Sequence, residues 1–458
     1  MVVQHNMQAM NANRMLNVTT SAQSKSTEKL SSGYRINRAA DDAAGLTISE
    51  KMRKQIRGLD QASTNAEDGV SSVQTAEGAL TEVHSMLQRM NELATQAANG
   101  TNSKDSDRQA IQDEIDQLTT EIDRVSETTK FNETYLLKGD KGATKNVYMN
   151  GHDAGLKGTL TDSAKSATFV MDELKAGNKV TIAGKEYSIG STVADAKASY
   201  AAAADGDTVT IDGTDYTVVG ATGTEDAGAN KLKINTLDTK VKDGSVVSYK
   251  TSKLTVMTDK NNDGVDDDDS SVISKSVAET KIQNELTAAN NIGTVDKAAT
   301  VTKATANGKT TYSIDKGYAT VADTLSFNLH VGADADMTNK INVDIDAMDS
   351  ASLGIKGLNI KDDSGNAATY AVDAISDAIS KVSSQRSSLG AVQNRLEHTI
   401  NNLDNVVENT TTAESRIRDT DMASEMVNYS KNNILAQAGQ SMLAQANQST
   451  QGVLSLLQ

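Results

Sequence analysis

The feature that most restricts the fold of this 458-residue chain is a helical pattern of apolar residues that continues for roughly 50 positions. Between Ala43 and Ala98, apolar side chains recur three or four residues apart, which places them on one face of a single helix. At 1.5 Å per residue this helix is on the order of 80 Å long, longer than ordinary domains contain. Asn99 and Gly100 end it. The apolar positions are Met52, Ile56, Leu59, Ala62, Ala66, Val70, Val73, Ala76, Leu80, Val83, Leu87, Met90 and Ala94.

Two further stripes have the same spacing, one at 111–125 and one at 375–407. The chain contains no proline, so its helices can run long without a kink. Narrow stripes of this length favour helices packed on one another as a long antiparallel rod, close to coiled-coil geometry. The alternative is a globular bundle of three independent amphipathic helices. The stripes are Ile111, Ile115, Leu118, Ile122 and Val125, and Ile375, Ile379, Val382, Leu389, Leu396, Ile400, Leu403 and Val407.

The two ends of the chain, residues 1–35 and 420–458, keep the helical period but are diluted by Asn, Gln, Ser and Thr. Each end has too little apolar surface to hold a helix alone. We therefore expect both ends to be ordered only when they pack together with copies of themselves, the alternative being frayed termini. Their apolar positions are Val3, Met7, Met10 and Leu16, and Met422, Met426, Ile434, Ala438, Met442 and Ala446.

The middle of the chain, residues 141–322, is rich in Gly, Asp, Thr, Val and Tyr in alternating patterns. It contains a loose repeat at 180–189 and 209–218, with a weaker copy at 304–314. Each copy has the pattern of a strand, a tight turn at a glycine and a second strand containing a tyrosine. The pattern predicts one or two small β-rich domains inserted into the helical part, with their two attachment points side by side.

Composition excludes several classes of protein. The net charge of −16 leaves no basic stripe for nucleic acid or anionic lipid at the level of the whole chain. The absence of cysteine excludes disulfides, thiolate metal sites and cysteine nucleophiles. No apolar run is long enough to span a membrane, and residues 1–6 lack the pattern of a cleaved secretory signal. Export would need a route without such a signal.

The sequence also lacks catalytic motifs. Its histidines are far apart and none lies in a zinc-hydrolase motif, and phosphate-binding loops and nucleophile elbows are missing. We therefore interpret the chain as a protein that is not an enzyme. The alternative, a catalytic domain grafted into residues 141–322, has no site motif to support it. The histidines are His5, His84, His152, His330 and His398.

One acidic segment, residues 259–269, resembles a loop that wraps a hard cation. Its oxygen-bearing side chains at alternate positions, followed by a glycine, are the arrangement that calcium loops use. The candidate calcium ligands are Asp259, Asn261, Asp263 and Asp267. Against this, Ser270 stands where an EF-hand has glutamate, and no flanking helices are evident. The alternative is a solvated acidic turn, and no other cofactor is expected.

Both ends of the chain carry segments that resemble the terminal signatures of bacterial flagellins. The similar stretches cover about 1–140 and 323–458 and bracket a middle without a recognisable counterpart. One departure is Tyr34, where flagellins often have Leu or a smaller residue. The amino-terminal signature is Leu30-Ser31-Ser32-Gly33-Tyr34-Arg35-Ile36-Asn37 with Asp41-Asp42-Ala43-Ala44-Gly45. The carboxy-terminal one is Glu414-Ser415-Arg416-Ile417-Arg418-Asp419-Thr420-Asp421-Met422-Ala423 with Leu435-Ala436-Gln437-Ala438.

The resemblance implies a division into three domains. Residues 1–42 with 418–458 would form the terminal coiled coil of the inner core. Residues 43–140 with 323–417 would form the helical rod, including a β-hairpin region that begins at Leu325. Residues 141–322 would be the variable surface insert.

The resemblance also implies function and partners. Flagellins are structural subunits that self-assemble into the extracellular filament used for swimming, so the first partner is the chain itself. The others would be the flagellar export apparatus with a secretion chaperone, and the filament cap and hook–filament junction proteins. A hook–filament junction protein, which forms a short ring, is the alternative identity. We expect neither nucleic acid nor a membrane as a partner.

A shorter similarity concerns the segment Gln88–Ala94, which resembles the region that the flagellin-sensing Toll-like receptor recognises. Arg89 and Leu93 match contact positions of the family, and Glu114 matches a third on the neighbouring helix. Arg89, Glu92 and Leu93 are close in helical phase, so we expect one exposed patch. In this family the same surface packs between subunits of the filament.

Overall fold

The computed structural model describes residues 6–103, 106–362 and 365–455. The chain divides into two compact units. The first contains the chain up to Ser71, the segment Phe327–Val343 and the chain from Ala391 onward. The second contains Ser72–Ser326 and Asp344–Gly390. The three-domain division implied by the resemblance stays a prediction.

Long helices dominate both ends of the sequence, which confirms the predicted fold class of a mainly helical protein with an inserted β-rich region. The predicted helix at 43–98 is α2, and the stripes at 111–125 and 375–407 lie in α3 and α8. The long helices are α1 (Met7–Ser32), α2 (Ala43–Ala97), α3 (Asp107–Thr128), α8 (Asn366–Arg418) and α9 (Met422–Ser455).

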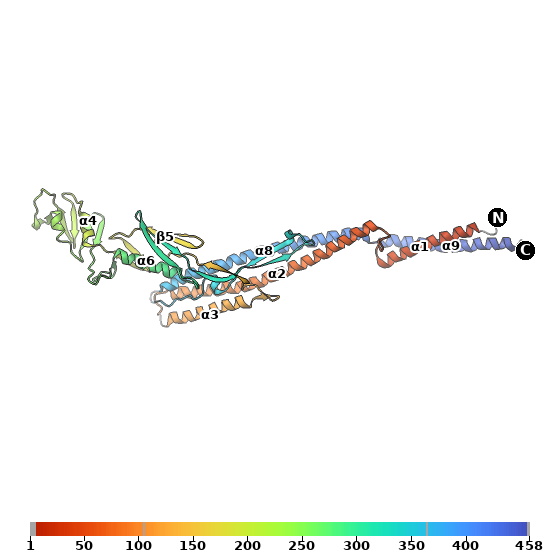
Figure 1. The fold of residues 1–458 in the computed structure, drawn as a ribbon, viewed down its shortest axis with the longest axis horizontal. Helices are drawn as coiled ribbons and strands as arrows, with labels where there is room; N and C mark the ends of the chain where they lie inside the picture. Colours follow the sequence, from red (N-terminus) through yellow and green to blue (C-terminus); the bar gives the residue numbers. More distant parts are fainter. Residues whose placement is uncertain (1–5, 104–105, 363–364, 456–458) are drawn as a thin grey trace. The chain divides into compact units, whose positions relative to one another are not determined.

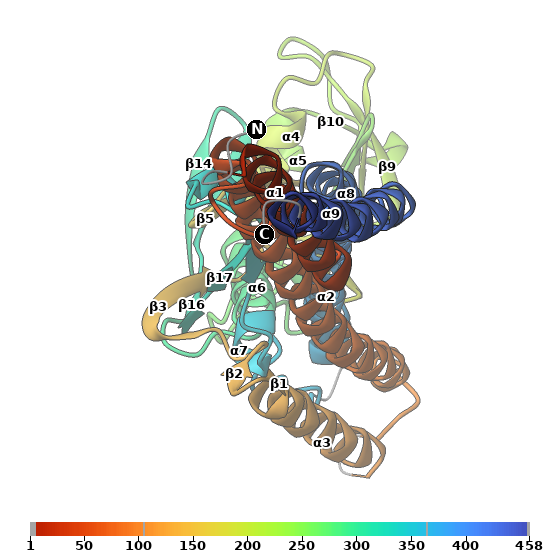
Figure 2. The ribbon, with the colours of Figure 1, turned by 90° about the vertical axis from the view of Figure 1, so that its right-hand side faces the viewer.

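In the first unit, α1 and α9 pack against each other as an antiparallel pair (Figure 1, Figure 2). The start of α1 meets the far part of α9, where Asn6 donates a hydrogen bond from its side chain to the carbonyl of Ala446 at 3.1 Å. Gly33 ends α1 in the left-handed conformation, with φ of 76°. Gly439 faces Leu16, and a Cβ there would lie in ordinary van der Waals contact with it, 3.4 Å from its Cδ1.

The predicted stripe on α2 forms the core. Its positions from Leu59 to Ala94, apart from the half-buried Val70, are buried. In the first unit Ala66 packs with Leu396 of α8 and Ile341 of the hairpin β17–β18. This hairpin confirms the β-hairpin region expected from the resemblance. In the second unit Leu80, Leu87 and Met90 are fully inaccessible to solvent.

The insert begins and ends on a strand pair. β3 (Asp140–Tyr148) and β16 (Tyr318–Asp323) run antiparallel, so the two attachment points lie side by side as predicted. Between these two strands in the sequence, the insert contains two separate hydrophobic cores. One gathers around Phe169, Ile282 and Tyr312, and the other around Tyr200 and Val209.

All three predicted repeats form hairpins, namely β6–β7, β8–β9 and β14–β15. The two turn residues of each have positive φ, as at Asp212 (50°) and Gly213 (78°). Two-residue turns of this kind match the right-handed twist of the flanking strands. Each of the first two hairpins also gains a parallel third strand, β13 or β10.

The strands and short helices have the following bounds. The strands before the hairpins of the insert are β1 (Lys130–Phe131), β2 (Thr134–Tyr135), β4 (Thr159–Asp162) and β5 (Ser166–Asp172). They are followed by β6 (Lys179–Ile182), β7 (Lys185–Ile189), β8 (Thr208–Ile211), β9 (Thr214–Val218), β10 (Lys231–Leu232), β11 (Val246–Tyr249), β12 (Ser252–Thr255) and β13 (Val272–Ile273). The last are β14 (Thr300–Ala306), β15 (Lys309–Asp315), β17 (Leu325–His330) and β18 (Lys340–Ile345). The helices are α4 (Val193–Tyr200), α5 (Ile234–Leu237), α6 (Lys275–Asn290) and α7 (Ser350–Leu353), with 3₁₀ turns η1 (Ala227–Ala229) and η2 (Met337–Asn339).

None of the helices in the described ranges combines the length and the apolar content that crossing a bilayer requires.

A backbone contact at Gly293 fixes the end of α6 against the loop after α7. Gly293 has φ of 73°, and a Cβ there would lie 2.0 Å from the carbonyl oxygen of Gly354. We expect Gly293→Ala to lower the free energy of unfolding by about 3 kcal/mol, because left-handed strain and a backbone clash add together. Gly184→Ala, at a φ of 76° with open space around it, should cost only about 1 kcal/mol. Chemical denaturation followed by circular dichroism measures both, and equal losses would contradict this account.

Candidate functional site

The terminal helix pair exposes many large apolar side chains. Met7, Met426 and Ile434 are 70%, 58% and 66% exposed. Within the part of α1 and α9 whose burial is described, only Ser26 and Ala436 are buried. The other exposed apolar residues of the pair are Met10, Met15, Val18, Met422, Val427, Leu435 and Met442.

A groove of about 740 Å³ runs between α1 and α9. Its lining includes Met15, Leu16, Leu435 and Met442. Complete burial of a side chain of this size is worth roughly 1.5–3 kcal/mol. A surface with this many exposed apolar side chains therefore carries a large unrealised free energy of burial, which a partner surface can supply.

A polar joint connects the terminal pair to α2 and α8 within the first unit. The guanidinium of Arg418 lies 4.9 Å from the centre of the Tyr34 ring and pairs with Glu50 at 2.7 Å. Arg35 donates to the carbonyl of Ile417 from Nε and Nη2, at 3.2 and 2.5 Å. The Tyr34 side chain thus has a specific partner. No local pattern in the sequence predicts this joint, because Arg35 and Ile417 are 382 positions apart.

In the second unit, the predicted receptor-binding residues Arg89, Glu92 and Glu114 form one ion-pair cluster. Arg89 of α2 donates to Glu114 of α3 at 2.9 Å and to Glu92 at 3.2 Å. All three side chains are largely exposed, at 51%, 44% and 70% for Arg89, Glu114 and Glu92. Hydrogen bonds to Glu114, and then to Glu92, raise the pKa of Arg89. The cluster presents fixed charges from two helices to solvent.

The expectation that Leu93 belongs to this exposed patch is wrong for the single chain. Leu93 is only 2% exposed and lies in the buried stripe of α2 with Met90, Ala94 and Ala97. The physical reason is its helical position, three residues after Met90 and four before Ala97, which turns it toward the core. Arg89 and Glu92 lie at the edge of that stripe and remain outside.

The acidic segment at 259–269 folds as a tight loop whose side chains bind its own backbone. Asp259 accepts hydrogen bonds from the amides of Asp263 and Gly264, at 3.1 and 2.9 Å. Asn261 accepts from the amide of Asp263 at 3.0 Å, and Asp267 from that of Lys260 at 2.8 Å. Asp263 accepts from the amide of Val265 at 2.8 Å, so all four predicted ligands lie in one loop and accept hydrogen bonds from its amides.

Side chains suited to holding a metal ion do not cluster in the described ranges, since no group of three or more His, Asp or Glu has a suitable arrangement there. The expectation that no helix flanks the acidic loop is wrong, because α6 begins at Lys275, shortly after the loop. The sequence does contain the pattern of this helix. Ser274 is a typical N-cap, and Ala278, Ile282, Leu286 and Ala289 have helical spacing.

Comparison with known proteins identifies both ends of the chain. Residues 3–142 match the family model of the bacterial flagellin N-terminal helical region, and residues 372–457 match that of the C-terminal helical region. The chain is 41% identical to a flagellin of Clostridium tyrobutyricum, over 98% of this chain and 100% of the relative. It is 37% identical to a flagellin of Bacillus subtilis, with both chains covered completely.

These relatives span the insert as well as the two helical ends, and both are named as flagellins, which favours a filament subunit over a hook–filament junction protein. The chain belongs to the bacterial flagellin family, the structural subunits of the extracellular flagellar filament used for motility, and it is not an enzyme.

Proposed function

We propose that this chain polymerises through α1 and α9, and that other copies cover the apolar side chains which the single chain leaves in water. The observation that carries the proposal is the exposure of Met7, Met10, Met426, Val427 and Ile434 on a helix pair with almost no buried residue. A contact between two different faces of identical subunits gives an open helix on repetition when its rotation does not close into a ring. The same faces are the surfaces offered to cap and hook–filament junction proteins at the two ends of the polymer.

The route of the subunit out of the cell stays a prediction. The flagellar type III channel, reached with a secretion chaperone, carries unfolded chains in this family. The absence of cysteine and proline from the chain suits that route, because neither disulfide formation nor slow prolyl isomerisation would delay refolding.

We expect the double substitution Met426→Glu with Val427→Glu to abolish polymerisation while leaving the monomer folded. Both side chains are more than half exposed in the single chain, so the charges cost little there, but in a subunit contact they would be buried without partners. Electron microscopy after seeding measures filament formation, and circular dichroism checks the fold of the monomer.

The matched control introduces the same charge on the insert, through Ala221→Glu with Thr224→Glu at two exposed positions. This variant should polymerise as the unmodified chain does. Normal filaments from the Met426 and Val427 variant, or loss of filaments in the control alone, would refute assembly through α9.

We propose further that the monomer is a ligand of the host flagellin-sensing Toll-like receptor, with Arg89, Glu92 and Glu114 as the contact cluster. The match of Arg89 and Glu114 to contact positions of the family supports this, as do the exposed ion pairs of Arg89 with Glu114 of α3 and with Glu92. Leu93, buried behind the cluster, would act by holding the helix surface in place.

In a reporter-cell assay we expect Arg89→Ala to raise the monomer concentration needed for half-maximal signalling by about tenfold or more. An arginine at the centre of an interface is a common hot spot, and its removal there costs about 2 kcal/mol or more, which exceeds a tenfold loss of affinity. Arg124→Ala is the matched control, because Arg124 is similarly exposed and paired with Glu121 on α3 outside the cluster. Equal potency of the Arg89 variant and the unmodified chain would exclude the cluster as the contact.

Calcium binding by the loop at 259–269 is a separate proposal, supported by the position of Asp259, Asn261, Asp263 and Asp267 in one tight loop. Calorimetric titration of the full chain with millimolar calcium should show binding that Asp263→Asn removes. Asp68→Asn, at an exposed position on α2 outside the insert, should leave it unchanged. No heat of binding in the unmodified chain would dispose of the site.

A further inference from the structure

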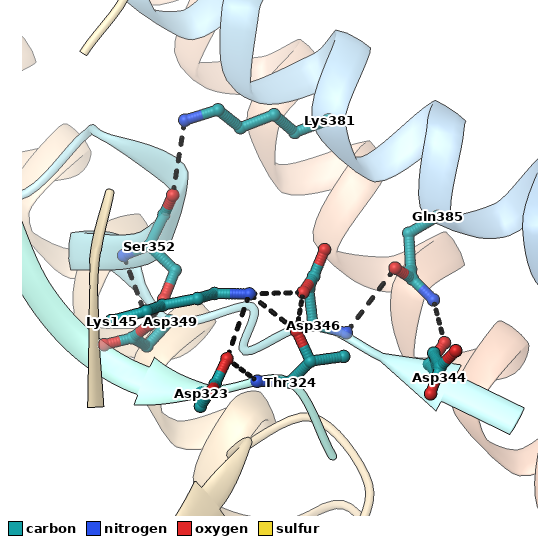
Figure 3. A network of polar contacts seen from close by, with 9 residues as sticks. All are labelled: Lys145, Asp323, Thr324, Asp344, Asp346, Asp349, Ser352, Lys381 and Gln385. Carbon is teal, nitrogen blue, oxygen red and sulfur yellow. Dashed lines mark hydrogen bonds and ion pairs between the residues drawn. The ribbon is translucent and has the colours of Figure 1, made fainter. Parts of the chain in front are cut away.

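A cavity of about 460 Å³ lies in the second unit beside α8, and two lysines line it. Figure 3 shows Lys145 from β3 and Lys381 from α8, with Gln385 holding the adjacent strand end. Val147, Met348 and Leu353 supply an apolar part of the wall. Both lysines therefore line the same cavity, so the partners and the charge environment of their amines can be compared directly.

Lys145 is fully occupied by acidic and hydroxyl partners. Its Nζ lies 2.6 Å from Asp346 Oδ1 and 2.7 Å from Thr324 Oγ1, with Asp323 at 3.8 Å. Burial would raise the pKa of Asp346, but hydrogen bonds from Lys145 and Thr324 hold it below its usual value. The carboxylate of Asp346 is thus stabilised in its charged form, and the Nζ of Lys145 is held between Asp346, Thr324 and Asp323.

Lys381 is in the opposite situation. Its Nζ donates one hydrogen bond, to the carbonyl oxygen of Ser352 at 3.3 Å (Figure 3). Among the described residues no carboxylate lies within 4.0 Å of it. Burial lowers the pKa of Lys381; Asp377 offsets part of this effect, and the positive charge of Lys316 adds to it. Compared with an exposed lysine, Lys381 therefore has a larger share of the neutral amine, which is the nucleophile.

We propose that Lys381 is an N-acylation site that accepts a short acyl group from an acyl phosphate without an enzyme. The lone pair of the neutral amine attacks the carbonyl carbon, a nitrogen–carbon bond forms, and the carbon–oxygen bond to phosphate breaks. Inorganic phosphate leaves with the bonding electron pair, and the proton lost from nitrogen passes to it or to water. No oxidant or reductant is involved.

The surroundings of Lys381 suit the product better than the starting ammonium. The amide removes a partly buried charge that has no carboxylate partner, and such a charge is costly. It also keeps one N–H, the number that the Ser352 carbonyl requires. The short acyl chain can lie against the apolar wall formed by Val147, Met348 and Leu353. The proposal does not depend on polymerisation or on the receptor.

The test exposes purified full-length monomer to acetyl phosphate near neutral pH and follows acetylation of each lysine by peptide mass spectrometry. We expect Lys381 to react at least about threefold faster than Lys145, which lines the same cavity, and than the exposed Lys240. The rate at Lys381 should also level off at a lower pH than the rate at Lys240. In urea the three lysines should react alike, because the difference arises from the fold.

Two results would overturn the proposal. The first is a rate at Lys381 no greater than the rates at Lys145 and Lys240 in the folded monomer. The second is an equal preference for Lys381 in urea, which would assign its reactivity to neighbouring residues in sequence. Asp346→Asn provides an independent check, since removing the partner of Lys145 should raise acetylation at Lys145 and leave the rate at Lys381 within about twofold.

Discussion

The incomplete burial of the apolar side chains on α1 and α9 is the constraint on which the behaviour of this molecule depends. Two paired helices shield only the stripes that face each other, so the remaining apolar side chains stay in water. Met10 and Ile434, at 63% and 66% exposed, are examples. A third layer would complete an ordinary core. In the proposed filament, other copies supply that layer. The terminal helices would then become ordered as the polymer grows.

The second unit, by contrast, contains hydrophobic cores that are buried within the single chain. On α2, Val73, Leu80 and Leu87 are fully buried inside the second unit, and the insert has two hydrophobic cores of its own. The insert is attached to the helical part of the chain at one place, the strand pair β3–β16. Because assembly is assigned to α1 and α9, the insert can change its surface without altering the contacts that build the filament.

Local patterns in the sequence predicted the long helices and the three hairpins, because each pattern involves residues only a few positions apart. The parallel pairing of Val272 with Ser188 had no such signal, since the two are distant in sequence. Leu93 was misplaced because similarity to a receptor-contact motif was given more weight than its position in the stripe of Met90 and Ala97. The resemblance placed Glu114 on the helix next to Arg89 but did not predict their ion pair. The difference between the partners of Lys145 and those of Lys381 arises from the tertiary fold alone.

Hydrogen exchange measured by mass spectrometry, on the monomer and on the polymerised chain, tests the central claim most directly. If assembly covers the terminal helices, backbone amides in α1 and α9 exchange quickly in the monomer and become strongly protected in the polymer. Amides in the insert core around Tyr200 and Val209 should be protected equally in both states. Terminal helices that are already protected in the monomer, or still unprotected in the polymer, would contradict the claim.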